Sequence, residues 1–160
     1  FDLVEAGNTV VLRTLSKAYG MAGARVGWGV FAPAIANEMR KVLTPNSLSA
    51  MTQAGARAAI LDQTYMRETC AQTQSLRDQT TRDLRALGLH VPDSFTNFVL
   101  IDVQTPARAR TLDGALKSHG LVLRGQAGVG LPHCLRMTLG PAPWVTDALA
   151  VIAQTLEDTA

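Results

Sequence analysis

A single lysine inside a run of small residues constrains this chain more than any other feature of its sequence. The run covers residues 14–29 and reads TLSKAYGMAGARVGWG, with Lys17 near its start and Arg25 further along. Apolar stretches at residues 9–12 and 26–31 lie on either side of the lysine. Two apolar strands that flank a glycine-rich loop predict an α/β sheet with a ligand at the strand ends.

The residues around Lys17 suit a particular chemistry. A lysine attacks a carbonyl only as a neutral amine, so it must be partly shielded from water and held by a tight backbone. Thr14, Ser16 and Arg25 could surround a phosphate, because hydroxyls and a guanidinium donate hydrogen bonds to its oxygens. Glycines let the backbone turn and approach a ligand closely, at positions 20, 23 and 27. An amine for an aldehyde beside a phosphate cradle is what pyridoxal 5'-phosphate requires.

Composition excludes several classes of protein. The 160 residues are 47% hydrophobic and 18% charged, which is typical of a globular chain with a buried core. The net charge is +2 and the basic residues form no run, so we expect no nucleic-acid partner. The first residue is Phe1 rather than methionine, which suggests a fragment.

Cysteine usage and hydropathy indicate where the protein works. The two cysteines lack motif spacing, so we expect reduced thiols in a cytoplasmic protein. No signal peptide and no apolar run of membrane-spanning length is visible, so we expect no membrane contact. His133 and Cys134 have no second ligand pair at useful spacing, and we therefore expect no metal site.

Hydrophobic periodicity predicts two parts of the chain. In residues 1–62 it predicts a short buried strand at 10–13, a second strand at 25–31, and helices at 33–42 and 49–61, the last with Met51, Ala54, Ala58 and Leu61 inward. In residues 63–160 it predicts a long helix over 64–87 ending at Gly88, strands at 96–103, 121–123 and 134–139, helices from 105 and over 143–157, and a glycine-rich loop at 125–132. This order predicts an α/β part that long helices join to a small α+β domain.

The segment Ser16–Gly27, SKAYGMAGARVG, resembles the lysine signature of the class I and II aminotransferases. The likeness continues through Thr-Asn-Phe at 96–98, Leu-Arg-Gly at 123–125 and Leu-Arg-Met-Thr-Leu-Gly at 135–140, and looks most like the histidinol-phosphate aminotransferase group. The resemblance implies the end of a fold type I large domain that binds pyridoxal 5'-phosphate, followed by a small C-terminal domain. It also implies a homodimer that transfers an amino group from an amino acid, or from histidinol phosphate, to a 2-oxo acid by a ping-pong mechanism.

The same resemblance assigns four residues to the cofactor. It implies that Lys17 forms a Schiff base with pyridoxal 5'-phosphate and afterwards moves a proton on the substrate. It implies that Thr14, Ser16 and Arg25 hold the cofactor's phosphate. Taken one at a time, Lys17 and Arg25 could instead be ordinary surface residues, and the hydroxyls could be turn residues that satisfy backbone groups.

Three further residues are assigned to the substrate by the resemblance. Arg136 would pair with an α-carboxylate, Asn97 would steady the same group, and Arg124 would face the distal end of the substrate. Histidinol phosphate lacks an α-carboxylate, so in that branch the arginines would bind its phosphate instead. Asn97 and Arg124 also fit purely structural roles.

Other interpretations stay open at this point. The histidinol-phosphate branch usually has a tyrosine after the proline of the linking segment, where this chain has Pro45–Asn46, and loop 125–132 is small and apolar. The missing tyrosine removes a hydroxyl and an aromatic wall that the histidinol-phosphate branch would use, and the apolar loop would suit an aromatic or other apolar side chain at least as well as a phosphate. A decarboxylase of a phosphorylated amino acid has a similar sequence layout. The family's remaining cofactor contacts precede the lysine and are not in this chain, so we expect the isolated chain to be inactive. A non-enzyme alternative is that the chain serves only as a folding and dimerisation unit.

Overall fold

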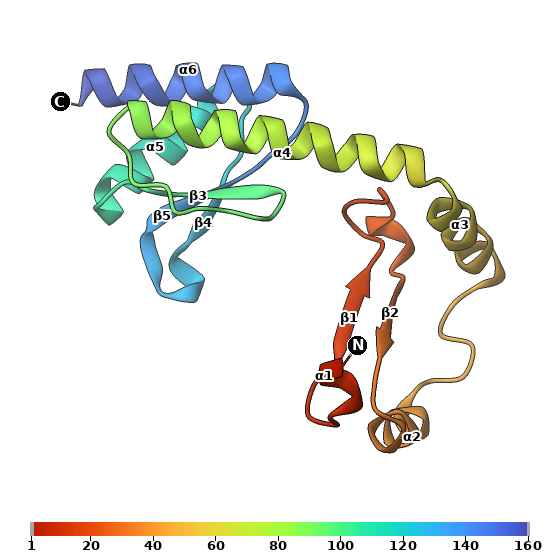
Figure 1. Cartoon of the computed structure of the whole chain (residues 1–160). Helices are drawn as coiled ribbons and strands as arrows, with labels where there is room; N and C mark the ends of the chain where they lie inside the picture. Colours follow the sequence, from red (N-terminus) through yellow and green to blue (C-terminus); the bar gives the residue numbers. More distant parts are fainter. Residues whose placement is uncertain (1, 160) are drawn as a thin grey trace. The chain divides into compact units, whose positions relative to one another are not determined.

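The structure is a computed structural model that describes residues 2–159, and it divides into two compact units. The first unit extends to Cys70 and the second begins at Ala71. The division lies inside helix α4 (Gln63–Ala86), so that each unit contains part of this helix (Figure 1). The sequence analysis put the boundary at the start of the same helix, between residues 62 and 63.

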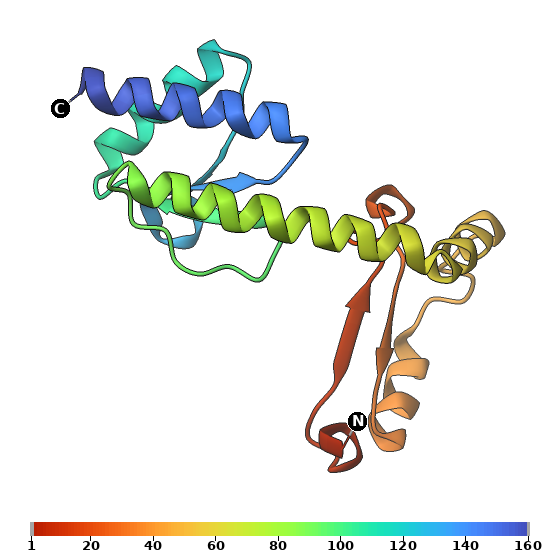
Figure 2. The same ribbon diagram turned by 45° about the horizontal axis from the view of Figure 1, so that its top comes forward.

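An antiparallel ribbon of two strands forms the centre of the first unit. Strand β1 (Val11–Thr14) pairs with β2 (Gly27–Val30), with Thr14 opposite Gly27 (Figure 2). The Ser49 side chain accepts a hydrogen bond from Thr52 N at the start of α3, as a helix cap does. The other elements of this unit are α1 (Asp2–Glu5), a 3-10 turn η1 (Ala22–Ala24), α2 (Pro33–Val42) and α3 (Ala50–Leu61).

Two sequence-based expectations for this unit are wrong. The strand expected to be buried is not, because 64% of Leu12 and 41% of Val10 are exposed. Among the described residues β1 pairs only with β2, and a ribbon of two strands buries little of either face. The inward face expected for α3 is also wrong, since Met51 is 86% and Leu61 is 69% exposed. This helix is itself rich in alanine, so its hydrophobic periodicity did not reveal that Ala56 is the residue that packs against the rest of the first unit.

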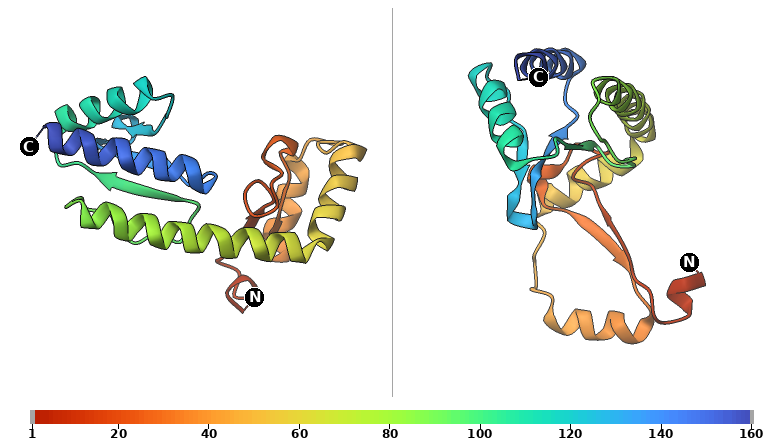
Figure 3. Two further views of the ribbon diagram at one scale, coloured as in Figure 1. Left: turned by 90° about the horizontal axis from the view of Figure 1, so that it is seen from above. Right: turned by 90° about the vertical axis from the view of Figure 1, so that its left-hand side faces the viewer.

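An antiparallel sheet of three strands, in the order β3-β5-β4, forms the base of the second unit. Helices α4, α5 and α6 lie on one side of it (Figure 1), and α5 and α6 lie side by side (Figure 3). The elements after α4 are β3 (Phe98–Asp102), α5 (Pro106–Ser118), β4 (Arg124–Gln126), the 3-10 turn η2 (Ala127–Val129), β5 (Leu131–Thr138) and α6 (Ala142–Asp158).

The strand register separates the sheet into a core face and an open face. Val99 pairs with Met137 and Ile101 with Leu135, and all four side chains are at most 3% exposed. They pack with buried residues of the three helices, Leu84, Leu112, Leu116 and Ile152. Because side chains alternate along a strand, the other paired residues lie on the opposite face, namely Phe98, Leu100, Asp102, Cys134, Arg136 and Thr138.

Helix ends in this unit follow their sequence signals, whereas one strand is displaced. Gly88 has φ +78 and Leu89 N donates to the Leu84 carbonyl, which closes α4. Thr105 caps α5 by accepting a hydrogen bond from Arg108 N. The strand expected at 121–123 forms instead at 124–126, where a register irregularity between Gly125 and Gln126 interrupts the pairing with β5. Among residues 2–159 no helix is both long enough and apolar enough to span a membrane.

The two cysteines should differ in reactivity. Cys70 is exposed, whereas Cys134 is 3% exposed, and burial together with the Asp102 carboxylate raises the pKa of the Cys134 thiol above its ordinary value of 9.0. Alkylation needs the thiolate, so at a given pH below that pKa Cys134 should react about tenfold or more slowly than Cys70.

Peptide mass spectrometry after iodoacetamide treatment across a pH series measures this difference. The rate at Cys134 should rise with pH, because the raised pKa keeps its thiol protonated at neutral pH. A Cys70→Ser control isolates the buried thiol, and equal rates at the two positions would contradict the prediction.

Candidate functional site

The loop between β1 and β2 holds Lys17 at the head of a tight turn. Gly20 N donates to the Lys17 carbonyl (2.9 Å), and Gly20 has φ +66, which glycine adopts without strain. Met21 N donates to the Leu15 carbonyl (3.0 Å), and Leu15 N donates to the Val26 carbonyl (3.1 Å). These backbone hydrogen bonds close the loop and fix the point at which the lysine side chain leaves the main chain.

Two buried side chains anchor the loop to the first unit. Leu15 is 1% and Val26 is 8% exposed, and both pack with Ala56 of α3. Their neighbours in the sequence, which include the predicted phosphate ligands, remain exposed or half-buried. The alternation of apolar and polar residues therefore decides which side chains of the loop can meet a ligand.

The predicted phosphate ligands lie at one end of the ribbon. Thr14 Oγ1 donates to Ser16 Oγ (2.8 Å) and accepts a hydrogen bond from Ser16 N (3.0 Å). The hydrogen bond from Leu15 to Val26 continues the ladder of β1 and β2, and Ser16 and Arg25 follow directly after this pair on the two sides of the loop. The Arg25 guanidinium donates to the Ala22 carbonyl (2.7 Å), and its other N–H groups make no further hydrogen bond within residues 2–159.

Lys17 differs from the other lysines of the chain. The sequence has three, and the structure pairs Lys41 with Glu38 and Lys117 with Asp113, each at 2.6 Å. Lys17 is exposed and makes neither an ion pair nor a hydrogen bond through its side chain to any described residue. Its amine is therefore available to a ligand, and the described residues do not by themselves shield it from water.

Two arginines face each other on neighbouring strands of the second unit. Arg124 of β4 is paired with Arg136 of β5, so both side chains lie on the open face of the sheet. Neither forms an ion pair with a carboxylate of the described residues, and Arg136 Nε is buried without a hydrogen-bond partner. Like charges directly opposite each other are destabilising unless an anion lies between them. This pair is therefore suited to an anionic group.

Sequence reasoning missed one residue beside this arginine pair. The ring of Phe98 lies under the Arg136 guanidinium, 4.9 Å from its carbon to the ring centroid. Such a contact holds the guanidinium plane in a defined orientation. The alternation of β3 was the available signal, because it puts Phe98 on the same face as Arg136.

Asn97 contributes to this region through its main chain. Its carbonyl accepts a hydrogen bond from Leu139 N (2.9 Å), which extends the pairing of β3 with β5. No hydrogen bond joins the Asn97 side chain to Arg136 within the described part of the chain. The contact that the sequence resemblance implied for Asn97 thus stays a prediction.

The Pro45–Asn46 pair forms a turn between α2 and α3. Asn46 has φ +60, the left-handed region that asparagine tolerates better than most side chains. A tyrosine at this backbone geometry would be strained by about 1–3 kcal/mol. The left-handed backbone therefore gives a local structural reason for asparagine rather than tyrosine at position 46.

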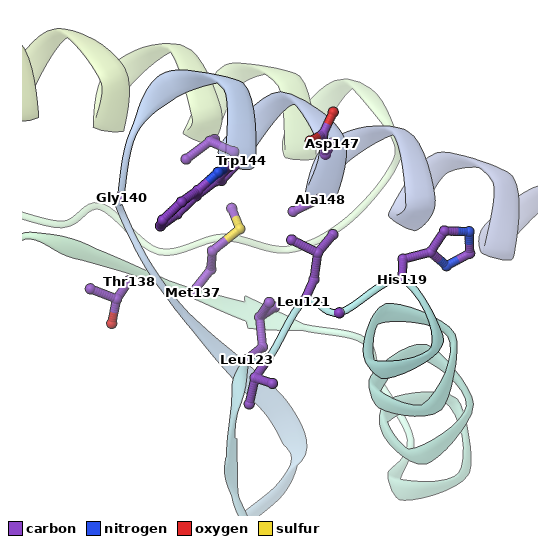
Figure 4. Close-up of a pocket in the computed structure, with 12 residues that line it drawn as sticks. His119, Leu121, Leu123, Met137, Thr138, Gly140, Trp144, Asp147 and Ala148 are labelled. Atoms are coloured by element: carbon purple, nitrogen blue, oxygen red, sulfur yellow. The ribbon is translucent and has the colours of Figure 1, made fainter.

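The second unit also contains a hollow of about 440 Å³, shown in Figure 4. It lies between the residues that follow α5, the end of β5 and the first turns of α6, and Trp144 lines it with 64% of its surface exposed. None of the seven predicted site residues lines this hollow. The geometry therefore gives it no part in the predicted chemistry.

Comparison with known proteins defines the class to which the chain belongs. A family model described as aminotransferase class I and II matches residues 1–152. The chain belongs to this family. The mixed α/β fold agrees with that of solved aminotransferases, which confirms the predicted fold class, whereas the detail of a small C-terminal domain stays a prediction.

Individual relatives show which members of the family the chain is similar to. The chain is 39% identical over 140 residues to a histidinol-phosphate aminotransferase of Jannaschia sp. (strain CCS1), covering 87% of this chain and 39% of that protein. It is 43% identical over 136 residues to one of Rhodopseudomonas palustris (strain BisA53), covering 83% of this chain and 37% of that protein. The structure of the Sinorhizobium meliloti histidinol-phosphate aminotransferase in complex with pyridoxal 5'-phosphate matches with a TM-score of 0.87 and 30% identity, over 98% of this chain and 43% of that chain. The chain thus spans about two fifths of the length of these relatives.

The position of Gly27 tests the geometry of the lysine loop. A Cβ at Gly27 would lie 2.5 Å from the Arg13 carbonyl oxygen, so Gly27→Ala must push the two strands apart next to Thr14. Gly23 has no atom within 4 Å of such a Cβ, so Gly23→Ala is a matched control. We expect Gly27→Ala to lower the free energy of unfolding of the first unit by about 1–3 kcal/mol, with little change for Gly23→Ala. Denaturant titration measures both, and equal stabilities would show that the strand pairing is wrong.

Proposed function

We propose that this chain carries the catalytic lysine and the ligand contacts of an aminotransferase that uses pyridoxal 5'-phosphate. The observation that supports this most directly is the lysine loop, in which Lys17 heads a closed turn beside the Thr14–Ser16 hydroxyl pair. Family membership and the relative that holds this cofactor give independent support.

The residues at this end of the ribbon fit a phosphate-bearing aldehyde. The Thr14 and Ser16 hydroxyls lie 2.8 Å apart, and Arg25 retains N–H groups without a partner among the described residues. Hydroxyl and guanidinium donors together form short, charge-assisted hydrogen bonds to phosphate. Because Gly27 has no side chain, β2 approaches β1 closely next to these donors.

Each residue has a distinct task in this proposal. When bound, the cofactor supplies a conjugated ring that withdraws electrons from the carbon that carries the amino group. Lys17 Nζ would hold the cofactor covalently and, once released, would move a proton to and from the substrate carbon. Thr14, Ser16 and Arg25 would fix the phosphate and thereby the distance between the aldehyde carbon and Nζ.

The exposure of Lys17 supports a second part of the proposal. Its amine must be neutral to attack, and an amine in bulk water is charged at neutral pH. Lys17 is exposed among the described residues, so other parts of the whole protein would have to cover it. We therefore propose that the 160-residue chain by itself is inactive, and that the whole protein is a homodimer like its family.

The arginine pair supports histidinol phosphate as the amino donor of the whole protein, with a 2-oxo acid as acceptor. A phosphate carries close to two negative charges at neutral pH, and Arg124 and Arg136 together supply two positive ones on one face. An amino acid with an apolar aromatic side chain supplies only its α-carboxylate, which would neutralise one of the two arginines and leave the other without a counter-ion. Asn97, next to β3, is proposed as a further contact to the same ligand.

Reductive trapping tests the assignment of Lys17. When the whole protein that contains this chain is mixed with pyridoxal 5'-phosphate and reduced with borohydride, peptide mass spectrometry should find the label mainly on Lys17. The controls are internal, because Lys41 and Lys117 are also exposed lysines. Arg25→Ala should lower the labelling of Lys17 about tenfold, the loss expected for one charge-assisted hydrogen bond, and leave the other two unchanged. Equal labelling of all three lysines would contradict the assignment.

Ligand titration followed by NMR tests the arginine pair. Histidinol phosphate should shift the Nε–H signals of Arg124 and Arg136, whereas histidinol, which lacks the phosphate, should not. Arg124→Ala and Arg136→Ala should each weaken binding about tenfold or more, because each removes a charged donor. Arg110→Ala on α5 is the control for a lost positive charge. Binding that survives both substitutions would exclude this site.

A further inference from the structure

Three side chains of different chemistry meet at one end of the sheet in the second unit. Asp102 is the last residue of β3, and His133 and Cys134 lie in β5. One carboxylate oxygen, one imidazole nitrogen and the thiol sulfur lie within 4.8 Å of one another. Cys134 is 3% exposed and the other two are half-buried, so the cluster is partly shielded from water.

Rigid backbone pairing holds these three residues in place. Asp102 is directly paired with Cys134, and Val103 N donates to the His133 carbonyl (3.1 Å). On its other side, Asp102 N donates to the His90 carbonyl (2.9 Å). The Asp102 carboxylate accepts a hydrogen bond from Gln104 N (2.7 Å), which fixes the orientation of the carboxylate. Sites on paired strands with such outer support hold their geometry better than sites on loops.

The donor set identifies the kind of ligand that it would bind. Thiolate, imidazole and carboxylate are the three side-chain ligands that zinc accepts, whereas magnesium and calcium prefer oxygen alone. Thiolate and carboxylate together neutralise a doubly charged cation, which reduces the cost of holding it in a half-buried position. Ligands of tetrahedral zinc lie roughly 3.5 Å apart, so a small closing movement of these side chains would complete the coordination.

We propose that Asp102, His133 and Cys134 form a binding site for a zinc-class divalent cation, with one coordination position left for water or another ligand. On binding, the Cys134 thiol releases its proton to solvent and its sulfur bonds to the metal, with no change of oxidation state. The spacing of His133 and Cys134 did not predict this site, because the third ligand comes from a strand that is distant in the sequence. The proposal does not depend on the proposed aminotransferase activity.

Cobalt substitution tests the site. Co²⁺ added to the reduced, chelator-treated 160-residue chain should produce a thiolate-to-cobalt absorption band that saturates at one ion per chain. Zn²⁺ should displace the cobalt and remove the band. Cys134→Ser should abolish the band, and Asp102→Asn and His133→Gln should each weaken cobalt binding about tenfold or more.

Matched controls come from the same chain. Cys70→Ser should retain the band, because Cys70 is exposed and outside the cluster, and so should His119→Gln at the C-terminal end of α5, which is also outside the cluster. Circular dichroism checks that each variant is folded, and His133→Gln, a change at a half-buried position, keeps the test valid if Cys134→Ser unfolds. The absence of a band, or a band that Cys70→Ser removes, would overturn the proposal.

Discussion

The backbone hydrogen bond from Leu15 to Val26, together with the burial of both side chains, determines the geometry of the lysine loop. It continues the strand ladder by one step beyond the pair of Thr14 and Gly27, and Ser16 and Arg25 are the next residues on the two sides of the loop. The buried pair also forces the intervening residues to leave the ribbon and return, and Gly20 makes that return possible. The placement of the polar side chains of the loop thus depends on two buried apolar side chains.

In the second unit, as in the lysine loop, buried apolar side chains determine where the polar side chains lie. Strand β5 is central, and its alternation gives one face to the helices and the other to charged and reactive side chains. Val99, Ile101, Leu135 and Met137 form the inner face, and their burial provides the main stabilising term of this unit. The arginine pair and the Asp102–His133–Cys134 cluster both occupy the outer face or its edge. Strand β5 therefore contributes to the hydrophobic core with one face and to the proposed ligand sites with the other.

Much of this organisation is predictable from the sequence. Helices α2, α3, α5 and α6 begin within about one residue of their predicted starts because Pro33, Ser49 and Thr105 are local signals that need no tertiary context. The lysine loop was predictable for the same reason, since its glycines and hydroxyls are contiguous in the sequence. Local sequence signals were sufficient to predict those elements that are determined by residues close together in the sequence.

What escaped prediction depends on contacts between distant residues. The exposure of Leu12 and Met51 follows from how many layers pack in the first unit, which periodicity does not encode. The displacement of β4 follows from an irregular pairing with β5, and the contact of Phe98 with Arg136 follows from strand register. The cluster of Asp102 with His133 and Cys134 likewise exists only once β3 and β5 are paired.

The left-handed backbone of Arg25, with φ +52, has a consequence for how this loop can evolve. Only glycine occupies that region freely, so an arginine there costs about 1–2 kcal/mol of folding free energy. Glycine at this position would relieve that cost and would also remove the guanidinium. Under the proposed role of Arg25 in holding the cofactor's phosphate, a stabilising library that accepts glycine at this position would select folded chains that bind the phosphate less tightly, a loss that screens for thermal stability would not detect.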